Sequence, residues 1–143
     1  MSGALLDVNV LVALAWPNHV HHWAASRWFN DAHTAGWATC PVTESGFIRV
    51  SSNRRVIPDA RSPREAAEVC RQMTQIQGHV FWSDDVAIAS APEVDFDRVQ
   101  GYRQVTDVHL LALAARNGGR LVSFDSALAN LSIAEVTVLT LDG

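Results

Sequence analysis

Short apolar segments of strand length alternate with longer stretches of helical character along this chain, and that alternation most restricts its fold. Strands are expected at residues 4–6, 37–40, 79–83, 120–124 and 136–141. Strands that alternate with helices form a mainly parallel sheet with helices on both faces. The chain has 143 residues, 48% of them hydrophobic, which is material for one core. We therefore predict a three-layer α/β/α fold in a single domain over residues 1–143.

The helices are predicted from apolar periodicity and from capping residues. They are expected over residues 9–15, 19–33, 41–50, 62–77, 107–117 and 126–130. Ser62, Pro63 and Glu65 form a favourable helix start, and Thr106 is expected to cap the long helix that follows it. The buried side of the 19–33 helix is expected to carry Val20, Trp23, Ala24, Trp28 and Phe29. Residues 84–103 are expected to form a helix or loops.

Four acidic residues stand at junctions between predicted strands and helices. Asp7 and Asp125 each follow an apolar strand, Glu44 lies in the first turn of a helix, and Asp107 opens another helix. Ligand sites in parallel sheets form beyond the carboxyl ends of the strands. We therefore expect the four side chains to converge at that edge of the sheet.

Such a carboxylate cluster indicates phosphodiester hydrolysis with a divalent cation. Mg²⁺ prefers carboxylate oxygen, and a bound metal favours deprotonation of water for attack on phosphorus. Without a cation, four neighbouring carboxylates would repel one another. A structural interpretation remains open for each acid, because Asp7 and Asp125 can cap the helices that follow them. Glu44 and Asp107 can equally be favoured by the positive end of a helix.

The basic residues restrict the chemistry further. All 11 are arginine, so a Walker phosphate-binding loop and Schiff-base catalysis, which need a lysine, are excluded. Receiver domains and Asp-nucleophile phosphatases also place acids at strand ends, but they use a lysine near the phosphate. The net charge of −4 argues against a nucleic-acid partner unless bound cations reverse the local charge. No glycine-rich turn follows the first strand, which excludes a dinucleotide site.

Four segments in order along nearly the whole chain resemble the motifs of the VapC family of PIN-domain toxins. These segments are residues 5–11, 43–49, 105–110 and 121–125. The resemblance implies a PIN-like α/β/α domain with a mainly parallel central sheet, and a Mg²⁺- or Mn²⁺-dependent endoribonuclease. It also implies a homodimer and a VapB-type antitoxin whose C-terminal segment occupies the active-site groove. Products would end in 5′-phosphate and 3′-hydroxyl.

The resemblance also assigns residues. Its catalytic and metal-binding acids fall on Asp7, Glu44, Asp107 and Asp125. Three further residues are candidates to orient the carboxylates by hydrogen bonds, although each could be an ordinary turn or cap residue. They are Asn9, Thr106 and Ser123.

The only basic concentration in the chain lies on and after the predicted 41–50 helix. Its members are Arg49, Arg54, Arg55, Arg61 and Arg64. They are candidates for contact with RNA phosphates or an acidic antitoxin, and the alternative is a solvated loop. A non-catalytic PIN-like module that binds RNA or protein is the competing function.

The remaining residues carry weaker signals. Cys40 and Cys70 are expected to be buried free thiols, because two cysteines are too few for a disulfide framework. The histidines match no zinc motif, and His109 is expected to face away from Asp107. The N-terminus lacks the features of a signal peptide, and no apolar run reaches the roughly 18 residues of a membrane span. A cytoplasmic protein is therefore expected.

Overall fold

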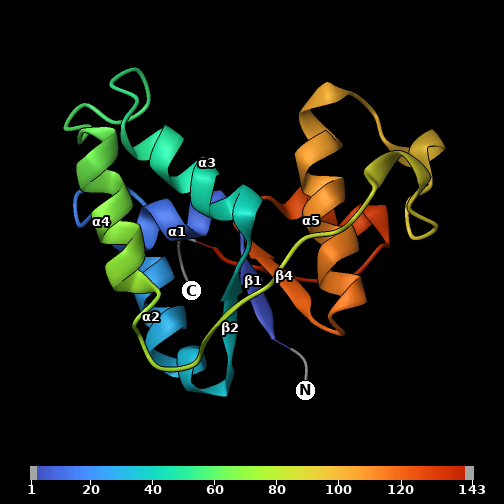
Figure 1. Cartoon of the computed structure of the whole chain (residues 1–143), viewed down its shortest axis with the longest axis horizontal. Coiled ribbons are helices and arrows are strands. Elements are labelled where there is room, and N and C mark those ends of the chain that lie inside the picture. The colour runs from blue at the N-terminus through green and yellow to red at the C-terminus, as the bar shows by residue number, and fades with distance from the viewer. Residues whose placement is uncertain (1–2, 141–143) are drawn as a thin grey trace.

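The computed structural model describes residues 3–140 and contains a five-stranded sheet between two layers of helices (Figure 1). The strands are β1 (Ala4–Leu6), β2 (Trp37–Thr39), β3 (His79–Phe81), β4 (Arg120–Ser123) and β5 (Glu135–Val138). Their order across the sheet is β3-β2-β1-β4-β5, and every neighbouring pair is parallel. The predicted three-layer fold with a parallel central sheet is therefore confirmed.

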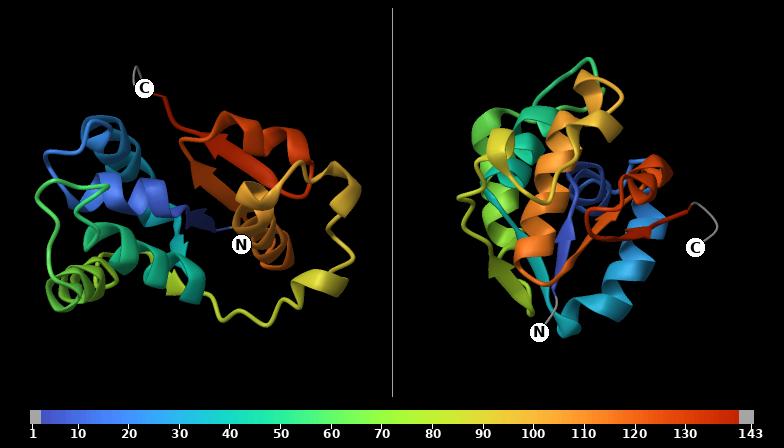
Figure 2. Two further views of the ribbon diagram at one scale, coloured as in Figure 1. Left: turned by 90° about the horizontal axis from the view of Figure 1, so that it is seen from above. Right: turned by 90° about the vertical axis from the view of Figure 1, so that its right-hand side faces the viewer.

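Alternate residues of the strands face two separate halves of the core. The helices are α1 (Val8–Ala15), α2 (His22–Ala32), α3 (Pro41–Ser51), α4 (Pro63–Met73) and α5 (Val105–Arg116). In β1, Leu5 packs with residues of α5, whereas Ala4 and Leu6 pack with residues of α1 to α4. Figures 1 and 2 show α5 alone on one side of the strands and the other four helices on the opposite side. Alternate residues face opposite halves of the core because successive side chains of a strand point to opposite faces of the sheet.

The start of α4 agrees with its sequence signature. The Ser62 hydroxyl accepts a hydrogen bond from the backbone N–H of Glu65 at 3.2 Å, and the Glu65 carboxylate accepts one from the N–H of Ser62 at 3.2 Å. These two bonds form the reciprocal capping box. The helix ends at Met73, four residues before the predicted end at 77. Turns at residues 74–78 then lead to Gly78, whose φ of 92° favours glycine.

The prediction that Thr106 caps the long helix is wrong. The helix begins one residue earlier, at Val105, with Gln104 in the cap position. The turn Tyr102–Gln104 runs directly into α5, so the helix needs no new start at Thr106. Asp107 consequently lies in the first turn of α5, and Thr106 is exposed.

The predicted start and buried face of α2 are also partly wrong. The helix begins at His22 rather than at residue 19, because two turns follow Pro17: His19 N–H bonds to the Trp16 carbonyl, and His22 N–H to the His19 carbonyl, each at 3.0 Å. Val20 lies before the helix and is 75% exposed, and Trp23, in its first turn, is 69% exposed. The buried face of the helix is formed by Ala24, Ala25 and Phe29.

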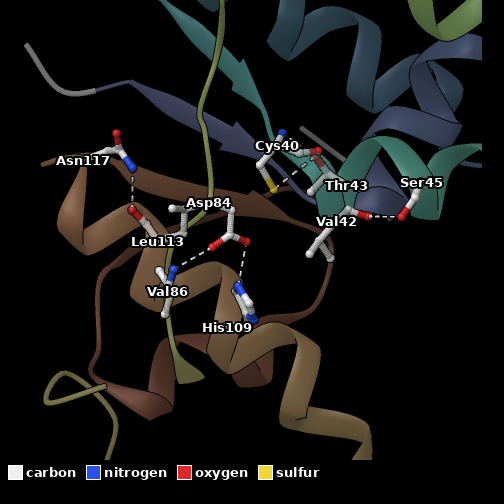
Figure 3. Close-up of polar contacts among 9 residues, drawn as sticks. All are labelled: Cys40, Val42, Thr43, Ser45, Asp84, Val86, His109, Leu113 and Asn117. Atoms are coloured by element: carbon white, nitrogen blue, oxygen red, sulfur yellow. Dashed lines mark hydrogen bonds and ion pairs between the residues drawn. The ribbon is translucent and has the colours of Figure 1, made fainter. Parts of the chain in front are cut away.

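Residues 84–103 form loops with three short 3-10 turns, which agrees with one of the two expected forms. Two contacts attach the segment to α5. His109 Nε2 lies 2.6 Å from Asp84 Oδ2, and Arg116 Nε donates to Glu93 Oε2 at 2.8 Å. Figure 3 shows the Asp84 carboxylate between His109 and the backbone N–H of Val86. The segment is therefore fastened against α5.

Three smaller expectations have clear outcomes. The last strand, β5, covers Glu135–Val138, whereas residues 136–141 were predicted, and residue 141 lies outside the described residues. Cys40 and Cys70 are buried free thiols, as expected. No helix within residues 3–140 is both long enough and apolar enough to cross a membrane.

The close approach of β4 to the start of β1 depends on Gly119. A Cβ at this position would lie 2.4 Å from the Gly3 carbonyl oxygen and 2.8 Å from the Trp82 ring. We predict that Gly119→Ala lowers the free energy of unfolding by about 1–3 kcal/mol, the usual cost of overpacking, in urea denaturation. Gly101→Ala is the matched control, because a Cβ there meets nothing within 4 Å. Equal stability of the two variants would contradict this explanation.

Candidate active site

The site forms where the chain changes sides of β1. In the sheet, β2 and β3 lie on one side of β1, and β4 and β5 lie on the other. Because the strand order reverses at β1, a crevice opens beyond the carboxyl ends of β1 and β4. Asp7 follows β1 directly, and its backbone N–H donates to the Val122 carbonyl of β4 at 2.9 Å. Asp125 follows β4 after one intervening residue. The β1–β4 pair therefore places both carboxyl groups at the same edge of the sheet.

A hydrogen-bond network orients the Asp7 carboxylate, which is 8% exposed. Its Oδ1 accepts from the N–H of Val8 at 2.8 Å, and its Oδ2 accepts from the Ser123 hydroxyl at 2.7 Å. The Ser123 oxygen in turn accepts from Asn9 Nδ2 at 3.2 Å and from the N–H of Asp125 at 3.1 Å. Asn9 and Ser123 thus make the contacts that residues orienting an acidic site would need.

Three of the four predicted acids line one depression of about 350 Å³, here called the acidic hollow. Its lining residues are Asp7, Val8, Asn9, Val12, His19, Val50, Val56, Asp107 and Asp125. Asp107 reaches it from the first turn of α5, on the opposite face of the sheet from α1. Sequence reasoning missed His19, Val50 and Val56, because nothing in the pattern indicates that their loop and helix ends border the acids.

The electrostatics of the acidic hollow are unfavourable for three bare carboxylates. Burial raises the pKa of Asp7, and so does Asp125, although the hydrogen bonds from Ser123 and Val8 lower it. Burial, together with repulsion from Asp7 and Asp125, raises the pKa of Asp107 to about 7. The fold therefore brings carboxyl groups together whose negative charge is not neutralised by side chains of the hollow.

This donor set fits a hydrated divalent cation. Mg²⁺ is commonly held by one or two carboxylates and keeps several waters. Within residues 3–140, no three or more His, Cys, Asp or Glu side chains are grouped so that they could hold a metal ion, so waters would have to complete the coordination of an ion in the hollow. Carboxylates that repel one another and line an open hollow suit an ion that retains part of its hydration shell.

The structure separates Glu44 from the other acids, so the expected convergence of four carboxylates is wrong for this residue. Glu44 Oε2 accepts a hydrogen bond from Thr39 Oγ1 at 2.6 Å, and the same hydroxyl lies 2.8 Å from His79 Nε2. Glu44 lines a different depression together with Cys70, Arg71 and His79, between α3, α4 and β3.

The rotation of α3 about its axis explains the position of Glu44. Gly46 faces α1, because a Cβ at this position would lie 2.6 Å from Val8 Cγ2. A residue two positions away lies about 200° around an α-helix. Glu44 therefore points away from α1 and from the acidic hollow.

None of the five arginines of the predicted basic cluster lines the acidic hollow. Four of its members, Arg49, Arg54, Arg55 and Arg64, are exposed on α3, on the loop after it and on the first turn of α4. Arg61 is exposed as well, and its guanidinium lies over the Trp16 ring, 5.6 Å from the ring centre. His109 pairs with Asp84, which agrees with the expectation that it faces away from Asp107.

The raised pKa of Asp107 has a consequence for stability. A carboxyl whose pKa is higher in the folded chain than its ordinary value of 3.8 stabilises the fold when protonated, and that contribution is lost as the pH rises through about 7. In EDTA, we therefore predict that Asp107→Asn raises Tm at pH 8 by at least about 2 °C, the shift that roughly 1 kcal/mol produces in a chain of this size.

The same variant should gain less at pH 5, where Asp107 is already protonated in the folded chain. Asp31→Asn, an exposed position on α2, serves as the control and should show no pH-dependent gain. Thermal unfolding of the three proteins at both pH values checks this, and a gain for Asp107→Asn that does not change with pH would contradict it.

Comparison with known proteins agrees with the fold. The sequence model of the PIN domain matches residues 4–134. Ribonuclease VapC39 of Mycobacterium tuberculosis is 56% identical over 127 residues, which cover 89% of this chain and 91% of that protein. Ribonuclease VapC38 of the same organism is 50% identical over 129 residues, or 90% and 89% of the two chains.

Two solved structures share the fold. VapBC2 from Rickettsia felis, bound to a DNA fragment from its promoter, has a TM-score of 0.67 at 8% identity and covers 96% of this chain and 98% of its own. FitAB bound to an IR36 DNA fragment has a TM-score of 0.64 at 14% identity and covers 94% of each chain. These identities show the fold alone. The sequence model and the close relatives together show that the chain belongs to the PIN-domain family, among the VapC ribonucleases.

Proposed function

We propose that this protein is a metal-dependent endoribonuclease that hydrolyses RNA phosphodiester bonds. The observation that carries the proposal is the acidic hollow, where aspartates from three separate elements lie together with their negative charge uncompensated. A stable fold without a function for these residues would gain by losing them. The names of the relatives, ribonucleases VapC39 and VapC38, support RNA as the substrate.

Asp7, Asp107 and Asp125 are the residues that would hold Mg²⁺ or Mn²⁺. The cation would supply positive charge that offsets their repulsion and favours deprotonation of the attacking water. Ser123 and the N–H of Val8 fix the Asp7 carboxylate through its two oxygens, so that it presents one orientation to a ligand. Asn9 holds the Ser123 hydroxyl in place for that task.

His19 contributes a polar group to the same hollow. Burial, with His21 and His22 nearby, lowers the pKa of His19, so the ring is neutral at pH 7. Its Nδ1 accepts a hydrogen bond from the N–H of His21 at 3.0 Å, which leaves the ring proton on Nε2. This N–H is available to donate to a phosphate oxygen in the hollow.

We further propose that the protein acts in the cytoplasm as a homodimer and that a VapB-type antitoxin inhibits it. The fold neighbours were solved as the VapBC2 and FitAB assemblies, which supports an antitoxin. An exposed tryptophan, Trp23 on α2, supports an interface on that helix. The five arginines of the basic cluster remain candidates for contact with RNA or with acidic residues of the antitoxin.

A binding module without catalysis is the second candidate function. The observation in its favour is the separation of Glu44 from the other acids, which leaves the acidic hollow with three carboxylates instead of four. RNA or a protein would then bind at the hollow without being cut. The two functions differ in their response to metal and to loss of one aspartate.

We predict that Asp7→Asn and Asp107→Asn each reduce RNA cleavage at least about 100-fold, because each removes a carboxylate proposed to hold the metal. Total bacterial RNA is incubated with antitoxin-free protein in Mg²⁺, in Mn²⁺ or in EDTA. Discrete fragments that require metal, and that disappear in both variants, support the nuclease. No cleavage by folded, metal-loaded native protein would favour the binding module.

Glu44→Gln is predicted to change the cleavage rate less than about tenfold, since its carboxylate bonds to Thr39 and lies outside the acidic hollow. The same assay measures it, with circular dichroism to verify folding. A loss as large as that of Asp7→Asn would show that Glu44 acts at the metal site and that α3 moves when substrate or metal binds.

A further inference from the structure

We propose that a second depression, next to the acidic hollow, binds one unpaired nucleobase of the RNA and so contributes to the choice of the bond that is cut. This inference rests on the proposed function, because it assigns a subsite to the same substrate. The depression, here called the base pocket, has a volume of about 360 Å³. It is lined by Trp16, Pro17, Asn18, His19, Val20, Val56, Ile57, Pro58, Asp59 and Arg61.

The base pocket adjoins the acidic hollow. His19 and Val56 line both depressions, so one wall separates them. A nucleotide whose phosphate lies among the aspartates could therefore place its base, or that of a neighbour, beyond this wall. The volume also falls within the roughly 300–1,000 Å³ of pockets that bind small molecules.

The wall of the base pocket is rigid before any ligand binds. The Trp16 ring stacks on Phe47 at 6.1 Å with an angle of 9° between the planes, and its Nε1 donates to Ser51 Oγ at 2.8 Å. The Arg61 guanidinium lies over the Trp16 ring, 5.6 Å from the ring centre, and the Arg61 backbone N–H donates to the Ser51 carbonyl at 3.0 Å. A preformed pocket orders less chain on binding and so loses less affinity.

The chemistry of the lining suits a nucleobase. Pro17, Val20 and Pro58 supply apolar contact for the flat faces of a ring. Asn18 and Asp59 supply an amide and a carboxylate, which can pair with donors and acceptors on a base edge.

Arg61 is the group that favours RNA as the occupant. Its planar guanidinium can stack on a base or bind two phosphate oxygens. Arg54 and Arg55 are exposed on the same loop and add positive charge close to the pocket. Positive charge beside the proposed cleavage site would attract the phosphates of the RNA backbone. A purely apolar pocket would not attract them.

The first test measures binding without cleavage. The ¹⁵N-labelled native protein is titrated with AMP, CMP, GMP and UMP in EDTA, and ribose 5-phosphate is the control ligand. We expect at least one nucleotide to shift the amide signals of residues 56, 57 and 59–61 and the Trp16 indole signal, and ribose 5-phosphate to leave them unchanged. No shift with any nucleotide, or equal shifts with ribose 5-phosphate, overturns the proposal and leaves the pocket to a protein partner.

A pair of matched variants locates the binding. Val20 lines the base pocket and is 75% exposed, whereas Val80 is 54% exposed on β3, away from both depressions. Val20→Trp should obstruct the pocket and weaken nucleotide binding at least tenfold, the scale of one lost base contact. Val80→Trp should bind as the native protein does. Equal affinities for the two variants would overturn the assignment.

Cleavage of a random RNA library then tests specificity. The native protein and Val80→Trp should show a base preference at one position beside the cut. In Val20→Trp, the ratio of cleavage rates between the preferred base and the others should fall at least tenfold, although the variant still cuts RNA. An unchanged preference in Val20→Trp overturns the proposal. If the native protein cuts no RNA but binds a nucleotide in the base pocket, the proposed nuclease function is wrong and the proposed nucleotide binding is still supported.

Discussion

The parallel pairing of β1 with β4 is the constraint on which the rest of the site depends. Leu5 and Leu6 lie opposite Leu121 and Val122, and this register places Asp7 beside the end of β4. The bond from the Asp7 N–H to the Val122 carbonyl continues the pairing past the last residue of β1. A slip of one residue would exchange the two faces of β1 and move Asp7 away from Ser123. The packing of both core halves and the position of the carboxylate therefore have one common cause.

The same pairing forces a conflict that the fold only partly relieves. Asp7 is almost fully buried, and a buried carboxylate is unfavourable unless hydrogen bonds or an opposite charge compensate it. Ser123 and the N–H of Val8 provide the bonds, but Asp107 and Asp125 add like charge. Local rules of stability are broken in this way at functional sites. The conflict is the physical reason to expect a cation here, independently of any relative.

The sequence predicted what depends on local patterns and missed what depends on the rotation of packed helices. The strands that precede Asp7 and Asp125 follow from apolar runs, and the start of α4 follows from Ser62, Pro63 and Glu65, so the sequence predicted them. Glu44 was misplaced because the direction of its side chain depends on Gly46 packing against Val8, a contact between helices that spacing does not reveal. Helix α2 starts late because two hydrogen-bonded turns precede it, which apolar spacing does not indicate.

The loop between α1 and α2 borders both depressions through His19. The stacking of His21 on Phe124 fastens the loop after α1 to the end of β4, one residue before Asp125. Trp16, held by Phe47, Ser51 and Arg61, fastens the start of the same loop to α3 and the loop beyond it. His19 lies between these two attachments and borders both depressions. A shift of this loop would therefore alter the acidic hollow and the base pocket together, so the proposed recognition of a base and the proposed positioning of the phosphate would be coupled.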